Sequence, residues 1–165
     1  MGNVMNLGRL LSDTARRLPG RTALVWGKES WTWAEMDARV NVLVAALRRH
    51  GLGKGDPILV QARNSNQLFE SLWAAFKLGA VWVPTNYRLT PPEVAYLATS
   101  SGAKALIYDD AFPDHADAVQ AASETLKLTI AIGSAREGEL SFDTLVVENL
   151  GAIEAEAEVD HGDPC

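Results

Sequence analysis

Four consecutive side chains stand where a substrate could be held. Thr85, Asn86, Tyr87 and Arg88 follow a short apolar run at residues 80–83 and the proline after it. The surrounding order predicts a helix, a glycine stop, a buried strand and then this polar loop. Because open α/β sheets bind ligands at the carboxyl ends of parallel strands, these four residues are the best candidates for a binding site. A polar turn that only begins the next helix remains the alternative.

A second group of polar residues has the side chains that a hard cation prefers. Asp109, Asp110, Asp114, His115 and Asp117 lie within nine positions of one another. Carboxylate oxygens suit magnesium or calcium, but this spacing matches no known ligand loop. Acidic residues are also favoured at the start of a helix by its dipole. We therefore predict a solvated helix entrance here and assign no metal ligand.

A glycine-rich run, Gly-Leu-Gly-Lys-Gly-Asp at residues 51–56, has the composition of a phosphate-binding loop. Such loops follow a strand and open a helix, so that the helix amides face the anion. Here the order is reversed, because a helix precedes the run and a strand follows it. The run is predicted to end a helix and turn into a strand.

The other residues with reactive side chains are scattered along the sequence. His50, His115 and His161 have no partner at a catalytic or metal-ligand spacing, and the single cysteine, Cys165, has no evident role as a nucleophile. No catalytic residue is therefore assigned. One cysteine also excludes an internal disulfide framework, and it favours a reducing compartment, with the cytoplasm expected.

The elements that would position these residues alternate between strand and helix. Such alternation predicts βαβ units in an α/β fold with parallel sheet layers. The apolar strands lack polar interruptions, as strands covered on both faces do. The predicted strands are 57–61, 80–83, 103–108 and 128–132, and the predicted helices are 67–78, 91–100 and about 114–125. A weak element follows at 142–147, and alternating residues at 153–159 indicate an edge strand or extended connector.

The amino-terminal region contains a helix, a hairpin and a second helix. The pattern Leu7, Leu10, Leu11, Thr14 and Leu18 is helical and one-sided, and it predicts a helix that docks on the body. Strands at 22–26 and 30–33 form a hairpin. A capping box at 32–35 begins a helix that continues toward residue 51, and another at 90–93 begins the helix at 91. Core packing is predicted for the five tryptophans, 26, 31, 33, 73 and 82.

Length and charge narrow the classes of function. The chain has 165 residues, 47% of them apolar, which is enough for one globular domain with a core. Its 21 acidic residues outnumber its 15 basic ones. Because phosphates are neutralised by a basic face, we expect no binding of nucleic acid or of an acidic membrane surface. No stretch reaches the length of a membrane span.

Residues 76–89 resemble the early core motif of adenylate-forming enzymes, roughly L-K-A-G-A-V-x-V-P-L-N-x-R-L. Three more segments are similar to that family in the same order, at residues 31–36, 53–65 and 93–103. The resemblance extends over about residues 7–164. Thr85 stands where Leu or Ile is commoner, and Trp33 where Tyr is usual. Tyr87 and Arg88 favour acyl-CoA synthetases, since peptide-synthetase relatives more often have an Asp-Pro pair there.

The resemblance implies a fatty-acid or related carboxylic-acid CoA ligase that uses ATP, Mg²⁺ and coenzyme A. The implied partners are a carboxylic acid, the rest of the large domain and a carboxy-terminal domain, and a homodimer is open. Residues 1–165 would be the amino-terminal part of the large, AMP-binding domain, ending before the family's phosphate loop. Thr85, Asn86, Tyr87 and Arg88 would border the substrate and CoA site, with Arg88 on a CoA phosphate. The chain alone is then expected to be inactive.

Two other readings stay open at this point. One is a free-standing α/β interaction module without chemistry of its own. The other is a small Rossmann-like nucleotide binder, although no glycine loop follows any predicted strand. A phosphate loop in the coding frame soon after residue 165 would favour the ligase. The acyl chain length and the oligomeric state cannot be read from these residues.

Overall fold

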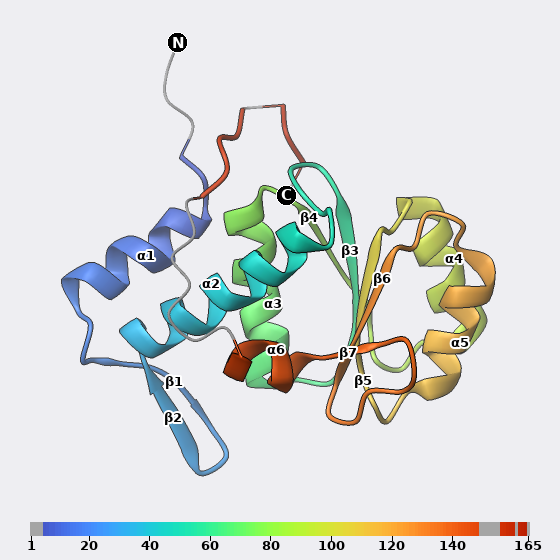
Figure 1. Cartoon of the computed structure of the whole chain (residues 1–165), viewed down its shortest axis with the longest axis horizontal. Coiled ribbons are helices and arrows are strands. Elements are labelled where there is room, and N and C mark those ends of the chain that lie inside the picture. The colour runs from blue at the N-terminus through green and yellow to red at the C-terminus, as the bar shows by residue number, and fades with distance from the viewer. Residues whose placement is uncertain (1–4, 149–155, 161, 165) are drawn as a thin grey trace.

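The computed structural model describes residues 5–148, 156–160 and 162–164. A parallel sheet with helices on both faces forms its larger part (Figure 1). At the other end of the molecule, the amino-terminal helix and hairpin contact helix α2 (Trp33–Arg49). The alternation of strands and helices along the sequence predicts this α/β architecture, and the structure confirms it.

The sheet has five strands in the order β4-β3-β5-β6-β7, and all neighbouring strands are parallel. The predicted strands match four of these to within two residues at each end. No pattern predicts β7, because two residues are too few to show a period. The strands are β3 (Pro57–Gln61), β4 (Val81–Pro84), β5 (Ala105–Asp109), β6 (Leu128–Ile132) and β7 (Leu140–Ser141).

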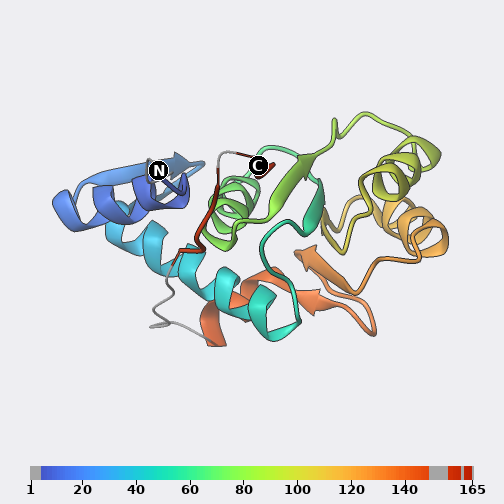
Figure 2. The ribbon, with the colours of Figure 1, turned by 90° about the horizontal axis from the view of Figure 1, so that it is seen from above.

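Helices cover both faces of this sheet. One face carries α2 (Trp33–Arg49), α3 (Asn66–Leu78) and α6 (Phe142–Glu148). The other carries α4 (Pro91–Ser101) and α5 (Pro113–Ala122), which lie side by side (Figure 2). The weak element predicted at 142–147 is the helix α6.

The strands β3, β4, β5 and β6 therefore each contribute to two cores. In β3, Ile58 and Val60 pack into the core under α2 and α3, whereas Leu59 packs into the core under α4 and α5. All three side chains are fully buried. This two-sided burial confirms the interpretation of the uninterrupted apolar strands.

Local signals set the starts of the helices. The Thr32 backbone N–H donates to Glu35 at 2.8 Å, and the Glu35 N–H donates to the Thr32 hydroxyl at 3.2 Å. The Thr90 N–H likewise donates to Glu93 at 2.8 Å. Both predicted capping boxes are confirmed, and each satisfies donors that the first helical turn leaves unpaired.

The glycine-rich run joins α2 to β3, as predicted. Gly51 and Gly55 have positive φ angles of 78° and 79°, a backbone region that glycine enters without steric cost. Between them, the Gly53 N–H donates to the Asp56 carboxylate at 2.9 Å. The run is thus a helix end and a turn, and it does not cap the start of a helix.

The first helix, α1 (Gly8–Arg17), docks on the body as predicted, but its buried face shares only Leu11 with the predicted pattern. Its buried residues are Gly8, Leu11, Ser12 and Ala15, whereas Leu7, Leu10 and Leu18 are exposed. A Cβ atom at Gly8 would lie 2.7 Å from the Lys77 Cα atom. Small residues form much of the buried face because they let the backbones of α1 and α3 approach this closely.

The hairpin has the predicted place, with β1 (Thr22–Trp26) paired antiparallel to β2 (Glu29–Thr32). Four of the five tryptophans, at positions 31, 33, 73 and 82, pack against the first core. Core packing is wrong for Trp26, which is 47% exposed. It lies beside the hairpin turn, at the far end of a two-stranded sheet in which β1 pairs with β2.

The chain after α6 returns to the amino-terminal region. Of the predicted edge strand or connector, positions 153–155 lie outside the described residues, as do His161 and Cys165. Residues 156–160 form a connector without regular structure. The Ala157 N–H donates to the Lys77 carbonyl at 2.8 Å, and Asn6 donates to the Ala157 carbonyl at 2.9 Å. None of the described helices is long and apolar enough to cross a membrane.

Candidate functional site at the carboxyl edge of the sheet

The strand order creates one point where neighbouring connections leave in opposite directions. From β3, the chain crosses through α3 to β4 on one side, and then returns through α4 to β5 on the other side. A crevice forms outside the carboxyl ends of strands at such a switch point. The loops after β3, β4 and β5 therefore border the position where this fold holds ligands.

An ion pair joins the two strands at this switch point. The Arg63 guanidinium donates two hydrogen bonds to Asp109, at 2.9 and 3.2 Å. Burial raises the pKa of Asp109, but the bonds from Arg63 and from the Ala111 N–H outweigh it and hold that pKa below its ordinary value. Asp109 therefore stays charged at neutral pH, and Arg63 remains 58% exposed at the crevice.

The four predicted site residues follow the edge strand β4, one strand away from the switch point. Thr85 points inward and anchors the loop: its backbone N–H and its hydroxyl both donate to the Val60 carbonyl, at 2.9 and 3.0 Å. The hydroxyl also contacts the Gln61 amide oxygen. Thr85 thus fixes the start of the loop to β3.

The next three residues form the exposed tip of the loop. The Asn86 side-chain oxygen accepts a hydrogen bond from the Arg88 N–H at 3.0 Å, which closes a tight turn. The Arg88 guanidinium lies 5.4 Å from the centre of the Tyr87 ring and donates to its hydroxyl at 3.1 Å. No carboxylate among the described residues pairs with Arg88. A guanidinium presented in this way can bind a phosphate group.

An apolar hollow of about 320 Å³ opens beside this tip. Leu89, Pro92, Tyr96 and Leu97 form most of its wall, and Glu93 contributes the polar part. Tyr96 is 71% exposed. The loop and the first turns of α4 thus place a cation next to an apolar surface.

His115, which the sequence groups only with the acidic residues at 109–117, contacts the far end of the loop. Its Nε2 atom lies 2.7 Å from the Leu89 carbonyl oxygen. The two residues are 26 positions apart, and His115 belongs to α5, so only the packing of α5 beside α4 brings them together. The sequence gives no signal for this contact.

The acidic side chains at 109–117 contact different partners and do not form one cluster. Asp110 accepts a hydrogen bond from the Ser134 N–H at 2.8 Å, and Asp117 forms an ion pair with Arg136 at 2.6 Å. Within residues 5–148, 156–160 and 162–164, no three His, Cys, Asp or Glu side chains gather in a way that could hold a metal ion. These residues do not fit a magnesium site.

Comparisons of the sequence agree on one family. A family model described as AMP-binding enzyme matches residues 11–165. The feruloyl-CoA synthase of Amycolatopsis sp is 36% identical over 119 residues, which are 72% of this chain and 24% of that protein. The 3-oxocholest-4-en-26-oate--CoA ligase of Rhodococcus rhodochrous is 26% identical over 97% of this chain and 28% of its own length. The chain thus spans about a quarter of these curated relatives.

Solved structures share the fold over nearly the whole chain. The N-terminal domain of FACL13 from Mycobacterium tuberculosis has a TM-score of 0.85 at 29% identity, with 97% of this chain and 40% of that chain covered. The anthranilate CoA ligase AuaEII, solved with anthranoyl-AMP, has a TM-score of 0.90 over 99% of this chain and 32% of its own, at 24% identity. At that identity the second likeness concerns the fold alone.

Proposed function

The chain belongs to the AMP-binding enzyme family, and we propose that it forms the amino-terminal part of the large domain of an AMP-forming acid–CoA ligase. In this proposal, residues 1–165 supply scaffold and one border of the substrate cleft. The family match over residues 11–165 and the CoA ligases among the similar proteins support the ligase over a free-standing interaction module.

The reaction would take place in two steps. A carboxylate is a poor electrophile, so its oxygen first attacks the α-phosphate of ATP to give acyl-AMP and releases pyrophosphate. The thiol of CoA then attacks the acyl carbon, and AMP leaves with the electrons of the broken C–O bond. Magnesium would neutralise phosphate charge in the first step. Because no three metal-ligating side chains gather among the described residues, no magnesium ligand is assigned in this chain.

The observation that carries the proposal for this chain is the Arg88 guanidinium at the carboxyl edge of the sheet. It is stacked near Tyr87, has no carboxylate partner among the described residues, and lies on a loop anchored by Thr85. We assign to it a contact with a phosphate group of CoA. Asn86 shapes the turn that presents it, and the apolar wall beside it would contact the uncharged part of that ligand.

The test of this assignment is Arg88→Ala in the full-length protein. We expect the KM for CoA to rise roughly tenfold, because a charge-assisted hydrogen bond to phosphate is lost. The acid-dependent exchange of pyrophosphate into ATP, which needs no CoA, should stay unchanged. Arg16→Ala is the matched control, since Arg16 is an exposed arginine on α1 that pairs with Asp13. An unchanged KM for CoA in Arg88→Ala would remove this contact from the proposal.

The chain by itself is proposed to lack adenylation activity. No catalytic residue is assigned in it, and the loops after its described strands carry no glycine-rich phosphate cradle that opens a helix. Exchange of labelled pyrophosphate into ATP, measured on residues 1–165 and on the full-length protein, tests this division. Acid-dependent exchange by residues 1–165 alone would refute it.

A fatty acid is the proposed substrate, in line with the resemblance of the core motif. An aromatic acid is the second candidate, because the feruloyl-CoA synthase shares 36% identity with this chain, against 29% for a medium/long-chain-fatty-acid ligase of Mycobacterium marinum. Release of AMP by the full-length protein with short, long and aromatic acids separates them. A preference for aromatic acids would replace the first candidate by the second.

A further inference from the structure

We propose that His115 is a positioning residue that holds the loop at 85–90 against the sheet and thereby sets the affinity for the ligand bound at its tip. The statement about the ligand rests on the proposed function, whereas the statement about the loop rests on the structure alone. Three features carry it: the anchoring of the loop at both ends, the chemistry of the contact between His115 and Leu89, and the packing behind the ring.

The two ends of the loop are held by different parts of the fold. Thr85 ties the first end to β3 through two hydrogen bonds to the Val60 carbonyl. At the other end, Leu89 is held through its carbonyl by His115, which comes from α5. Between these anchors, the backbone hydrogen bonds of the tip to other described residues are local: the Arg88 N–H donates to the Asn86 side-chain oxygen and the Leu89 N–H to the Asn86 carbonyl, both at 3.0 Å.

The contact fixes which nitrogen of His115 carries a proton. A carbonyl oxygen only accepts hydrogen bonds, so Nε2 must be the donor to Leu89 at 2.7 Å. The Nδ1 atom is buried and has no hydrogen-bond partner in the described structure. A proton on Nδ1 would be an unsatisfied buried donor, so the contact with Leu89 assigns the donor proton to Nε2. His115 then acts as a fixed donor.

Residues near the switch point pack against the His115 ring. It packs edge to face on Phe112, with ring centres 5.3 Å apart. The Arg63 guanidinium lies 5.8 Å from the centre of the Phe112 ring and pairs with Asp109. A continuous series of contacts thus links the loops after β3 and β5 to the loop after β4. His115 is the member of this series that touches the loop.

The matched variants are His115→Leu, His115→Gln and His50→Leu in the full-length protein. Leucine removes the donor, whereas the glutamine amide can donate from a position close to Nε2. His50 is the control, because it also contacts a backbone carbonyl, that of Ala46 at 2.9 Å, but it lies at the end of α2. Circular dichroism spectra identical to wild type show that each variant is folded.

Limited trypsin digestion measures how readily the loop opens, since trypsin cleaves the peptide bond after Arg88. Cleavage after Arg21, in the turn between α1 and β1, is the internal reference. We expect His115→Leu to speed cleavage after Arg88 by roughly threefold to tenfold, as the loss of one hydrogen bond allows, and His115→Gln to restore the wild-type rate. Cleavage after Arg88 at the wild-type rate in His115→Leu would overturn the proposal.

The KM for CoA separates this proposal from the proposed function. We expect His115→Leu to raise it roughly threefold to tenfold, His115→Gln to stay near wild type and His50→Leu to have no effect. Faster cleavage with a raised KM supports both statements. Faster cleavage with an unchanged KM in His115→Leu and in Arg88→Ala retains His115 as the anchor of the loop and refutes the loop as the CoA site. A raised KM in Arg88→Ala alone refutes only the effect of His115 on affinity.

Discussion

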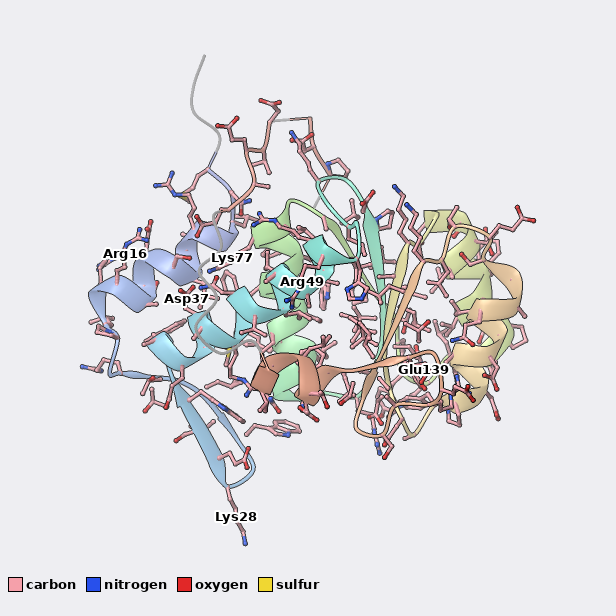
Figure 3. All side chains as sticks on the ribbon, viewed as in Figure 1. Arg16, Lys28, Asp37, Arg49, Lys77 and Glu139 are labelled. Atoms are coloured by element: carbon pink, nitrogen blue, oxygen red, sulfur yellow. The ribbon has the colours of Figure 1, made fainter. Side chains whose placement is uncertain are left out.

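Replacing Asp37 with alanine should destabilise the protein far more than replacing its buried partner Lys77 with methionine. The Lys77 Nζ atom, on a side chain that is 1% exposed, donates to Asp37 at 2.6 Å and to Asn41 at 2.6 Å. The labelled Asp37 and Lys77 side chains meet between α2 and α3 (Figure 3). Asp37 is 20% exposed and also accepts a hydrogen bond from Ser12 at 3.1 Å, so this pair joins three helices.

The two substitutions differ in what they leave behind. Asp37→Ala leaves a buried ammonium group without its counter-ion, which costs about 3–5 kcal/mol. Lys77→Met removes the charge and keeps most of the apolar stem, while Asp37 retains Ser12 and partial contact with water. We expect it to cost about 1–2 kcal/mol, near the value of lost hydrogen bonds. The double variant should be more stable than Asp37→Ala alone, because it no longer buries a lone charge.

Urea unfolding followed by tryptophan fluorescence measures these differences, since four of the tryptophans pack against the core that contains α2 and α3. Asp37→Asn keeps an acceptor oxygen without the charge and should fall between wild type and Asp37→Ala. Equal losses in Asp37→Ala and Lys77→Met, or a double variant that loses the sum of both, would refute the reasoning. Either result would mean that the ammonium group finds water or another partner when Asp37 is removed.

Two further predictions concern packing and pH. Gly8→Ala should lower the free energy of unfolding by about 1–3 kcal/mol, because the new methyl group would lie 2.5 Å from the Lys77 Cγ atom. Gly20→Ala is the control, since a methyl group there would have nothing within 4 Å, and equal losses in the two variants would contradict the close approach of α1. Burial, together with the hydrogen bond to Glu139, raises the pKa of Tyr108 to about 12 from an ordinary value of 10.0. A raised folded-state pKa means that this stabilisation is fully present below pH 10 and is lost as the pH rises toward 12. Unfolding free energies measured from pH 9 to 11.5 should therefore fall more steeply in wild type than in Tyr108→Phe, and parallel curves would contradict this burial.

The sequence by itself determined the order and type of the elements that carry the fold. Capping boxes, glycine stops and uninterrupted apolar strands each depend on a few neighbouring residues, so they can be predicted from a single sequence. The same local reasoning placed the polar residues 85–88 in a loop after a strand, and the structure has them there. The strand was predicted to be buried, which is wrong, because β4 lies at the edge of the sheet and its residues are only partly buried. Local reasoning was only partly right for α1, which docks as predicted and buries Leu11 but leaves Leu7, Leu10 and Leu18 exposed, while small residues complete the buried face.

Only the tertiary structure decided which of these residues meet. Arg63 and Asp109 are 46 positions apart, Lys77 and Asp37 are 40 apart, and His115 and Leu89 are 26 apart. Such contacts depend on the order of strands in the sheet and on the packing of neighbouring helices, and neither leaves a periodic trace in a single sequence. The loop that is proposed to border the site was therefore predictable from local patterns, whereas the switch point and the contact of His115 with that loop depend on packing between distant segments.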